Sequence, residues 1–199
     1  MSFREYWEEV WARKGDTNTL DLRTLNGYEA TTADSEFISN FITNSLCVSN
    51  SDKVLDIGCG AGMLSQHIAK KCIYSGVDKS QSLIDKHIKI LGNNVKVSEA
   101  NDLPFRDKEF DVSFSFGVFH YFPDESYVIS VIREMIRVTK FNIFIGDLPV
   151  ESKRPEHTLF NKKFFERLFK NIEFSTGLYE PNAKYRFNVL VKDIENSTL

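Results

Sequence analysis

Cysteine, proline and long apolar runs are all scarce in this 199-residue chain. The three cysteines, Cys47, Cys59 and Cys72, cannot all pair with one another and lack the spacing of metal ligands, so we expect reduced thiols in a cytoplasmic protein. No apolar run reaches the roughly 20 residues that span a bilayer, so neither a membrane span nor a metal site is expected. No stretch rich in proline, glycine or serine divides the chain, which favours a single domain.

An excess of charge of one sign is also missing. The 25 basic and 28 acidic side chains leave a formal net charge of −3, which argues against a general binder of nucleic acid or anionic membranes. The N-terminus carries Glu5, Glu8 and Glu9 where a signal peptide has a basic start and an apolar stretch. Hydrophobic residues make up 42% of the chain, enough for a packed core, which excludes wholesale disorder.

Apolar spacing divides the chain into two helices followed by alternating strands and helices. Residues 3–13 are expected to form one helix, and a second is expected to begin at residues 33–35. Apolar strands that alternate with helices predict a parallel sheet covered on both faces. The expected strands are residues 54–57, 73–77, 95–97, 110–116 and 141–145, and the helices among them are residues 62–71, 80–91 and 124–138.

The last part of the chain has a different pattern. A helix at residues 161–170 is followed by two expected strands, 172–179 and 185–191, which are joined by residues 180–183 alone. A direct connection this short can only join antiparallel strands. The fold class is therefore α/β, with a mixed sheet that ends in a C-terminal hairpin.

The strongest local signal is the segment Val-Leu-Asp-Ile-Gly-Cys-Gly-Ala-Gly at residues 54–62. A strand leads into a turn with Gly58, Gly60 and Gly62 at alternate positions, and a helix is expected directly afterwards. Glycine permits positive φ and lets a ligand approach the backbone, while a helix N-terminus offers N–H groups to an anion. Ligands of open α/β sheets bind at the carboxyl ends of the strands, where this turn lies.

Asp78 stands at the end of the next expected strand. A carboxylate there can accept hydrogen bonds from both hydroxyl groups of a ribose. The order strand, glycine turn, helix, strand, acid therefore predicts a ligand that contains a nucleoside. The alternative is a tight turn followed by a solvated residue at a helix start, and the joint placement of both features makes it less favoured.

A dinucleotide such as NAD fits this pattern less well. Its fingerprint places the third glycine at position 63, where this chain has Met63. A dinucleotide enzyme also usually needs a separate substrate domain, for which 199 residues leave little room. An NAD-dependent oxidoreductase is therefore the alternative and not the first choice.

Residues 54–62 resemble the first motif of the class I S-adenosylmethionine-dependent methyltransferases, which is a hydrophobic strand, an acid and then G-x-G-x-G. The similarity continues through Asp78 and through residues 103–105, 110–112, 118–124 and 133–138, and it is greatest to the small-molecule, UbiE-like (type 11) subgroup. It implies a Rossmann-like, doubly wound, mostly parallel seven-stranded sheet. Residues 1–33 would form an N-terminal helical lid segment, and residues 34–199 would form the methyltransferase domain.

The resemblance also implies a cofactor, S-adenosyl-L-methionine, which leaves as S-adenosyl-L-homocysteine. Gly58, Gly60 and Gly62 would carry its methionine and ribose end, and Asp56 would help to hold the methionine amino group, directly or through water. Asp78 would bind the ribose hydroxyl groups.

Further residues are assigned by position to the rest of the cofactor. Lys79 and Ser80 would lie beside the adenine. The acid that bonds the adenine amino group aligns with either Glu99 or Asp102, and the favoured contacting stretch is Ala100, Asn101 and Asp102. Phe116 and Gly117, at the end of the fourth strand, would form the floor beneath the sulfonium.

Methyl transfer from a sulfonium is an in-line displacement with a neutral leaving group, so a catalytic base is optional. His120 is the best candidate for such a base, although a packing role is slightly favoured. Tyr121 and Asp147 either bind the acceptor or have structural roles. Tyr28 is the expected lid contact, and the N-terminal aromatic residues form either a lid or a packed helix face.

The expected acceptor is a small molecule that is methylated on oxygen or nitrogen. Residues 151–170 carry six basic and three acidic side chains, which either receive a phosphorylated or nucleotide-linked acceptor or, as is favoured, form the solvated face of a helix. Nucleic acid is not expected, because no Asn-Pro-Pro-Tyr-like motif follows the fourth strand and the composition is not basic. A non-catalytic protein of the same fold is a further alternative, and a monomer or homodimer is expected.

Overall fold

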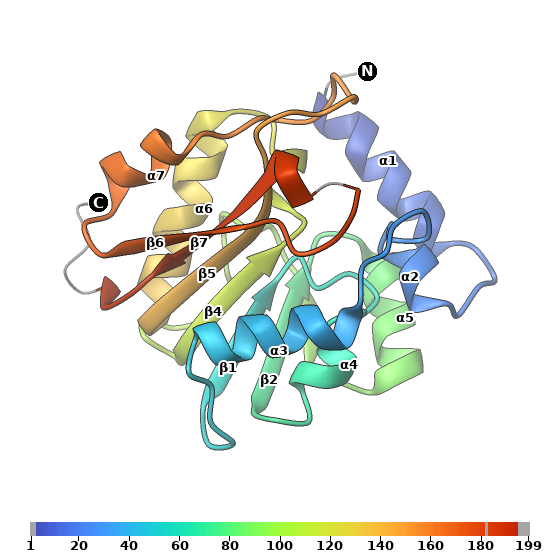
Figure 1. Cartoon of the computed structure of the whole chain (residues 1–199). Helices are drawn as coiled ribbons and strands as arrows, with labels where there is room; N and C mark the ends of the chain where they lie inside the picture. The colour runs from blue at the N-terminus through green and yellow to red at the C-terminus, as the bar shows by residue number, and fades with distance from the viewer. Residues whose placement is uncertain (1–2, 182, 195–199) are drawn as a thin grey trace.

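The computed structural model describes residues 3–181 and 183–194, which form a seven-stranded sheet with helices on both faces (Figure 1). The predicted boundaries at residues 1 and 199, and Asn182 in the predicted hairpin connection, lie outside the described residues. The strands are β1 (Lys53–Ile57), β2 (Ile73–Asp78), β3 (Val95–Val97), β4 (Phe110–Phe116), β5 (Thr139–Pro149), β6 (Ile172–Thr176) and β7 (Arg186–Val191).

The strand order is β3-β2-β1-β4-β5-β7-β6. The strands from β3 to β5 in this order pair in parallel, and β7 pairs antiparallel with both β5 and β6. The chain moves outward from β1 to β3 and then returns to β4 on the other side of β1. This reversal places the carboxyl ends of β1 and β4 side by side, which is where open α/β sheets bind ligands. The predicted doubly wound, mostly parallel sheet with an antiparallel hairpin is confirmed.

Side chains that accept backbone N–H groups fix the starts of most helices. Four helices, which begin at Ser35, Gln81, Glu125 and Lys162, are capped in this way by the residue before each start: Asp34, Ser80, Asp124 and Asn161. The helices are α1 (Phe3–Gly15), α2 (Leu22–Leu25), α3 (Ser35–Ser45), α4 (Ser65–Ile68), α5 (Gln81–Leu91), α6 (Glu125–Val138) and α7 (Lys162–Leu168), and two 3-10 turns are η1 (Phe119–Tyr121) and η2 (Ala183–Tyr185).

Three elements differ from the expectation. The helix predicted at residues 62–71 is only the single turn α4, because Gly62 has a φ of 98°, which a right-handed helix does not contain. Strand β5 is longer than predicted, since it pairs with β4 on one side and β7 on the other. The short helix α2 was not predicted, and Asp21 begins it by accepting from the backbone N–H groups of Arg23 and Thr24.

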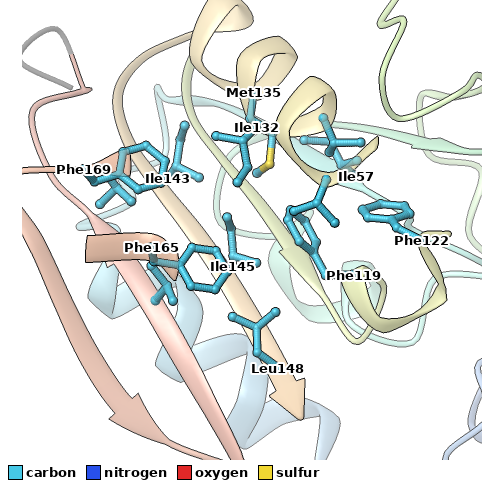
Figure 2. Close-up of a cluster of buried hydrophobic side chains, with 14 of the residues drawn as sticks. Ile57, Phe119, Phe122, Ile132, Met135, Ile143, Ile145, Leu148, Phe165 and Phe169 are labelled. Carbon is cyan, nitrogen blue, oxygen red and sulfur yellow. The ribbon is translucent and has the colours of Figure 1, made fainter. Parts of the chain in front are cut away.

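Alternating residues of each strand supply two hydrophobic layers. On one face, Ile143 and Ile145 of β5 pack with α6 and α7, as Figure 2 shows. On the other face, Phe144 packs with α3, and the short helix α4 belongs to the same layer. Strands buried on both faces explain the near-continuous apolar runs in the sequence. Among the described residues, no helix is long and apolar enough to cross a membrane.

Replacing Ile145 with alanine tests the first layer. Ile145 is fully buried, so the cavity left by Ile145→Ala is expected to lower the free energy of unfolding by about 2–5 kcal/mol in urea denaturation. Phe141 lies on the same strand with 55% of its surface exposed, and Phe141→Ala should change the same quantity by no more than about 0.5 kcal/mol. Equal losses in the two variants would contradict this assignment of the core.

Candidate functional site

A cavity of about 610 Å³ lies at the carboxyl ends of the parallel strands. Its floor comes from the turn after β1, the end of β2 and the end of β4, and α1 contributes one wall. Figure 1 shows α1 beside α2 and α5 at this end of the molecule. The volume is in the range of small-molecule and cofactor sites. The residues that carry the argument below are Trp7, Trp11, Tyr28, Gly58, Gly60, Asp78, Lys79, Glu99, Phe116, Gly117 and Tyr121.

The turn after β1 is held against β2 by its backbone. The N–H groups of Gly58 and Cys59 both donate to the carbonyl oxygen of Val77, at 2.8 and 3.0 Å. Gly58 has a φ of 81°, and a Cβ atom there would collide with Val118. A side chain at Gly60 would collide with Asn26. The glycines therefore allow both the turn and the close approach of neighbouring segments, as the sequence predicts.

Asp78 fastens this turn from the end of β2. One carboxylate oxygen accepts from Gly60 N–H at 2.9 Å and the other accepts from Ser80 N–H at 2.9 Å. Burial raises the pKa of Asp78, and these backbone hydrogen bonds oppose the rise. Each oxygen keeps a second lone pair, and Asp78 lines the cavity, so the carboxylate is available to a ligand.

Asp56 lies beneath the turn and is buried. Its Oδ2 atom accepts from the Tyr74 hydroxyl at 2.9 Å. Burial raises the pKa of Asp56 to about 8, with a further rise from the charge of Asp78 and a partial offset from the Tyr74 hydrogen bond. Asp56 lines a second, small cavity of about 20 Å³ that shares Tyr28, Gly58 and other residues with the large one. The structure therefore places Asp56 next to the main cavity and not in its lining.

Lys79 joins two segments that border the cavity. Its Nζ atom lies 2.8 Å from Glu99 Oε1 and also forms an ion pair with Glu8 of α1. Glu99 in turn accepts from the Tyr127 hydroxyl at 3.0 Å. This network connects α1 to the segment after β3, and it was not visible in the sequence because Glu8 and Lys79 are 71 residues apart.

The residues after β3 that line the cavity come earlier in the chain than the sequence predicts. They are Ser98, Glu99 and Ala100, whereas Asn101 and Asp102 are outside the lining. Asp102 N–H donates to the carbonyl oxygen of Glu99, and this turn carries the chain past the cavity. Of the two acids left open by the alignment, Glu99 is therefore the one that borders the cavity.

His120 is only 2% exposed and is not part of the cavity lining described here. Its ring lies 4.1 Å from the ring of Tyr121 and 4.5 Å from that of His157, centroid to centroid. Burial holds the pKa of His120 well below its ordinary value, and the charge of Arg186 lowers it further. This geometry favours the packing role over the role of a base, while Tyr121 itself lines the cavity.

The N-terminal aromatic residues meet the end of η1. Trp7 and Trp11 of α1 both contact Tyr121, with ring centroids 4.5 and 5.2 Å apart, and Trp7 Nε1 donates to the carbonyl oxygen of Glu156 at 3.0 Å. Both tryptophans line the cavity, as does Tyr28 from the connection between α2 and α3. These contacts place the aromatic face of α1 against the cavity, and the predicted lid role of the N-terminal segment stays a prediction. Gly62 and Ser80 flank the turn, with Ser80 in the lining and Gly62 outside it.

Asp147 lies near the end of β5, two residues before Pro149, and is 3% exposed. Its Oδ2 atom accepts from the Tyr179 hydroxyl at 2.8 Å and from Arg186 Nη1 at 2.7 Å. Burial raises the pKa of Asp147 to about 6, and the charge of Arg186 limits the rise. The sequence analysis missed Tyr179 and Arg186. The only signal for Arg186 was a cationic residue at the start of a mostly apolar strand.

No cluster of histidine, cysteine, aspartate or glutamate suited to a metal ion occurs within the described ranges.

Comparison with known proteins gives one family and several relatives. Residues 54–142 match a family described as a methyltransferase domain. The chain is 34% identical over 92 residues to tRNA (carboxymethyluridine(34)-5-O)-methyltransferase of Arabidopsis thaliana. The aligned region is 46% of this chain and 22% of that protein. It is 28% identical over 136 residues to demethylmenaquinone methyltransferase of Thermotoga maritima. That aligned region is 65% of this chain and 57% of that protein. The chain thus spans about a fifth of the tRNA-modifying relative.

Solved structures share the fold. The N-methyltransferase NodS of Bradyrhizobium japonicum, in complex with S-adenosylhomocysteine, has a TM-score of 0.74 at 13% identity, over 93% of this chain and 97% of that one. Phosphoethanolamine N-methyltransferase 1 of Haemonchus contortus has a TM-score of 0.73 at 15% identity, over 96% of this chain and 48% of that one.

The raised pKa of Asp56 predicts a pH-dependent stability. The folded chain retains a proton on Asp56 up to about pH 8, whereas the unfolded chain releases it near pH 4. The stability that depends on the protonated form of Asp56 is fully present below pH 4. It is lost as pH rises toward 8, and the free energy of unfolding falls by at most about 1.4 kcal/mol per pH unit. In ligand-free protein, Asp56→Asn should remove this slope.

Urea unfolding at pH 5, 6.5 and 8 measures the difference between wild type and Asp56→Asn. The variant should gain stability relative to wild type as pH rises. The exposed Asp107 offers the control, Asp107→Asn, which should follow the wild-type profile. Parallel curves for wild type and Asp56→Asn would contradict a buried, protonated Asp56.

Proposed function

We propose that this chain, whose residues 54–142 match a methyltransferase domain, is an active class I S-adenosylmethionine-dependent methyltransferase that acts on oxygen or nitrogen of a small molecule. The observation that carries the proposal is the pairing of Asp78 with Gly60 N–H at the floor of a 610 Å³ cavity. A carboxylate and an exposed glycine backbone are what a ribose and a methionine group require.

The cavity fits S-adenosylmethionine in charge as well as in size. The groups proposed to hold it are Asp78 for the ribose and Gly58 and Gly60 for the methionine end, with Asp56 beneath them. Aromatic rings and carboxylates attract a sulfonium cation, and the rings of Phe116 and Tyr28 border the expected position of that cation. When bound, the cofactor supplies an electrophilic methyl group.

The remaining task of the protein is alignment and exclusion of water. Trp7 and Trp11 of α1 cover the cavity with apolar surface, and Lys79 fastens α1 through its ion pair with Glu8. We propose that α1 acts as a lid, which opens for exchange of the cofactor and closes for transfer.

A nucleoside of tRNA is the second candidate acceptor, since a tRNA-modifying enzyme is among the relatives. The small-molecule acceptor has better support, because within the described part of the chain five acidic residues and one lysine line the cavity. The acidic lining of the cavity would repel a polyanion such as tRNA. A cytoplasmic location stays a prediction from the unpaired cysteines.

The proposal predicts that Asp78→Ala binds S-adenosylhomocysteine at least about tenfold more weakly, because each lost hydrogen bond to a charged group is worth roughly 1.5–3 kcal/mol. Isothermal titration of wild type should show binding of S-adenosylmethionine and none of NAD. Asp107→Ala provides the matched control and should bind like wild type.

Release of S-adenosylhomocysteine in the presence of a mixture of small metabolites, or of total tRNA, then separates the two acceptor classes. Binding of NAD in preference to S-adenosylmethionine would overturn the assignment of the cofactor. Binding of S-adenosylmethionine without product release in any mixture would favour the non-catalytic alternative.

A further inference from the structure

Asp147 holds an unused hydrogen-bonding atom close to the floor of the cavity. Its Oδ2 atom is engaged by Tyr179 and Arg186, but its Oδ1 atom is buried and has no partner among the described residues. A buried carboxylate oxygen without a partner is costly, and such atoms in native proteins usually await a ligand or water.

The backbone of Asp147 is also held in an unfavourable conformation. Its φ is 64°, in the left-handed region that non-glycine residues seldom adopt. Asp147 N–H donates to Asn188 Oδ1 at 2.9 Å, and Arg186 Nη1 donates to the carbonyl oxygen of Asp147 at 2.9 Å as well as to its carboxylate. Neighbouring side chains therefore impose this backbone position, and strain of this kind is concentrated at functional sites.

Gly117 connects Asp147 to the cavity. A Cβ atom on Gly117 would collide with the Tyr28 hydroxyl and would lie 3.6 Å from Asp147 Oδ2. Tyr28 and Gly117 line the cavity, whereas Asp147 is outside the lining and approaches it through this position over Gly117. The Tyr28 hydroxyl and the Asp147 carboxylate thus approach the same point above the end of β4, where the methyl group would be transferred.

The charge of the cavity indicates what can occupy that point. Among the described residues, the acids that line it are Glu8, Asp16, Asp78, Asp85 and Glu99, and the one lysine or arginine is Lys79, which is itself paired with Glu8 and Glu99. In the described chain, none of the six basic residues of segment 151–170 reaches the lining. The phosphorylated acceptor considered from the sequence would therefore meet only a lysine that two carboxylates already neutralise.

The aromatic residues of the cavity complete the argument. Trp7, Trp11 and Tyr121 form contacting rings on the side of α1, and Tyr28 faces the floor. Such faces accept an apolar body or a cationic head group. A phosphate or carboxylate group gains nothing from them.

Building on the proposed function, we propose that the acceptor is a small amine whose nitrogen is held near Gly117 between the Tyr28 hydroxyl and the carboxylate of Asp147. This site requires the Tyr28 side chain to move out of the space over Gly117 that its hydroxyl fills in this structure. The amine then donates an N–H to the unpartnered Oδ1 atom of Asp147, which directs the nitrogen lone pair toward the methyl group.

The atoms and charges of this reaction balance. An amine that enters as an ammonium ion gives one proton to Asp147, which passes it to water before transfer, so that the carboxylate again accepts an N–H from the amine. The free lone pair then forms the new N–C bond while the C–S bond breaks, and the electron pair of that bond stays on sulfur. The methylated amine leaves with its positive charge and the thioether leaves neutral.

Binding without turnover tests this assignment. Wild-type protein saturated with S-adenosylhomocysteine is titrated calorimetrically with four matched probes: phenethylamine, phenethyl alcohol, 3-phenylpropionate and phenethyl phosphate. The amine should bind most tightly. Asp147→Asn turns an N–H group toward the amine, because the amide oxygen stays with Arg186, and Tyr28→Phe removes the hydroxyl. Each should weaken amine binding by at least about tenfold.

Asp193 supplies the matched control. It also has a left-handed φ, 50°, but is exposed and distant from the cavity, so Asp193→Asn should bind the amine like wild type. Far-UV circular dichroism spectra and urea unfolding transitions like those of wild type show that each variant is folded. Amine binding that survives both Asp147→Asn and Tyr28→Phe, no amine binding at all, or another probe binding as tightly as the amine overturns the amine site. Failure of wild type to bind S-adenosylhomocysteine defeats instead the proposed function.

Discussion

The hydrogen bonds that Asp78 accepts from Gly60 and Ser80 are the constraint on which the site depends. They join the turn after β1 to the end of β2, two segments that only the parallel pairing of these strands brings together. Because the turn is fixed before any ligand binds, its backbone needs no reordering to receive one. Preorganisation of this kind lowers the entropic cost of binding.

Two further acidic side chains are buried near the cavity. Asp56 and Asp147 both have raised pKa values because burial disfavours their charged forms. They lie on either side of the cavity floor, near the ends of β1 and β5. Burial of these carboxyl groups destabilises their charged forms. A cationic ligand that binds nearby stabilises the same charged forms. A sulfonium cofactor and an amine acceptor are both ligands of that kind.

Several features followed from local patterns in the sequence. The strands, the antiparallel hairpin and the glycine turn have strong local signals, so they were predicted nearly at their observed positions. The helix after the turn was predicted too long, because apolar spacing carries no information on the positive φ of Gly62. The cavity-lining residues after β3 were predicted two positions too late, because a turn closed by Glu99 and Asp102 cannot be distinguished in the sequence from an extended loop.

The sequence by itself determined the fold class and the turn after β1 with its partner Asp78, since these depend on residues close together in the chain, such as Gly58, Gly60 and Asp78. Only the tertiary structure decided the surroundings of Asp147. Asp147, Arg186 and Tyr28 come from three distant segments, and they meet because β7 inserts beside β5 and the N-terminal segment folds back over β4. Periodicity reports which face of an element is buried, but not which distant side chains share that face.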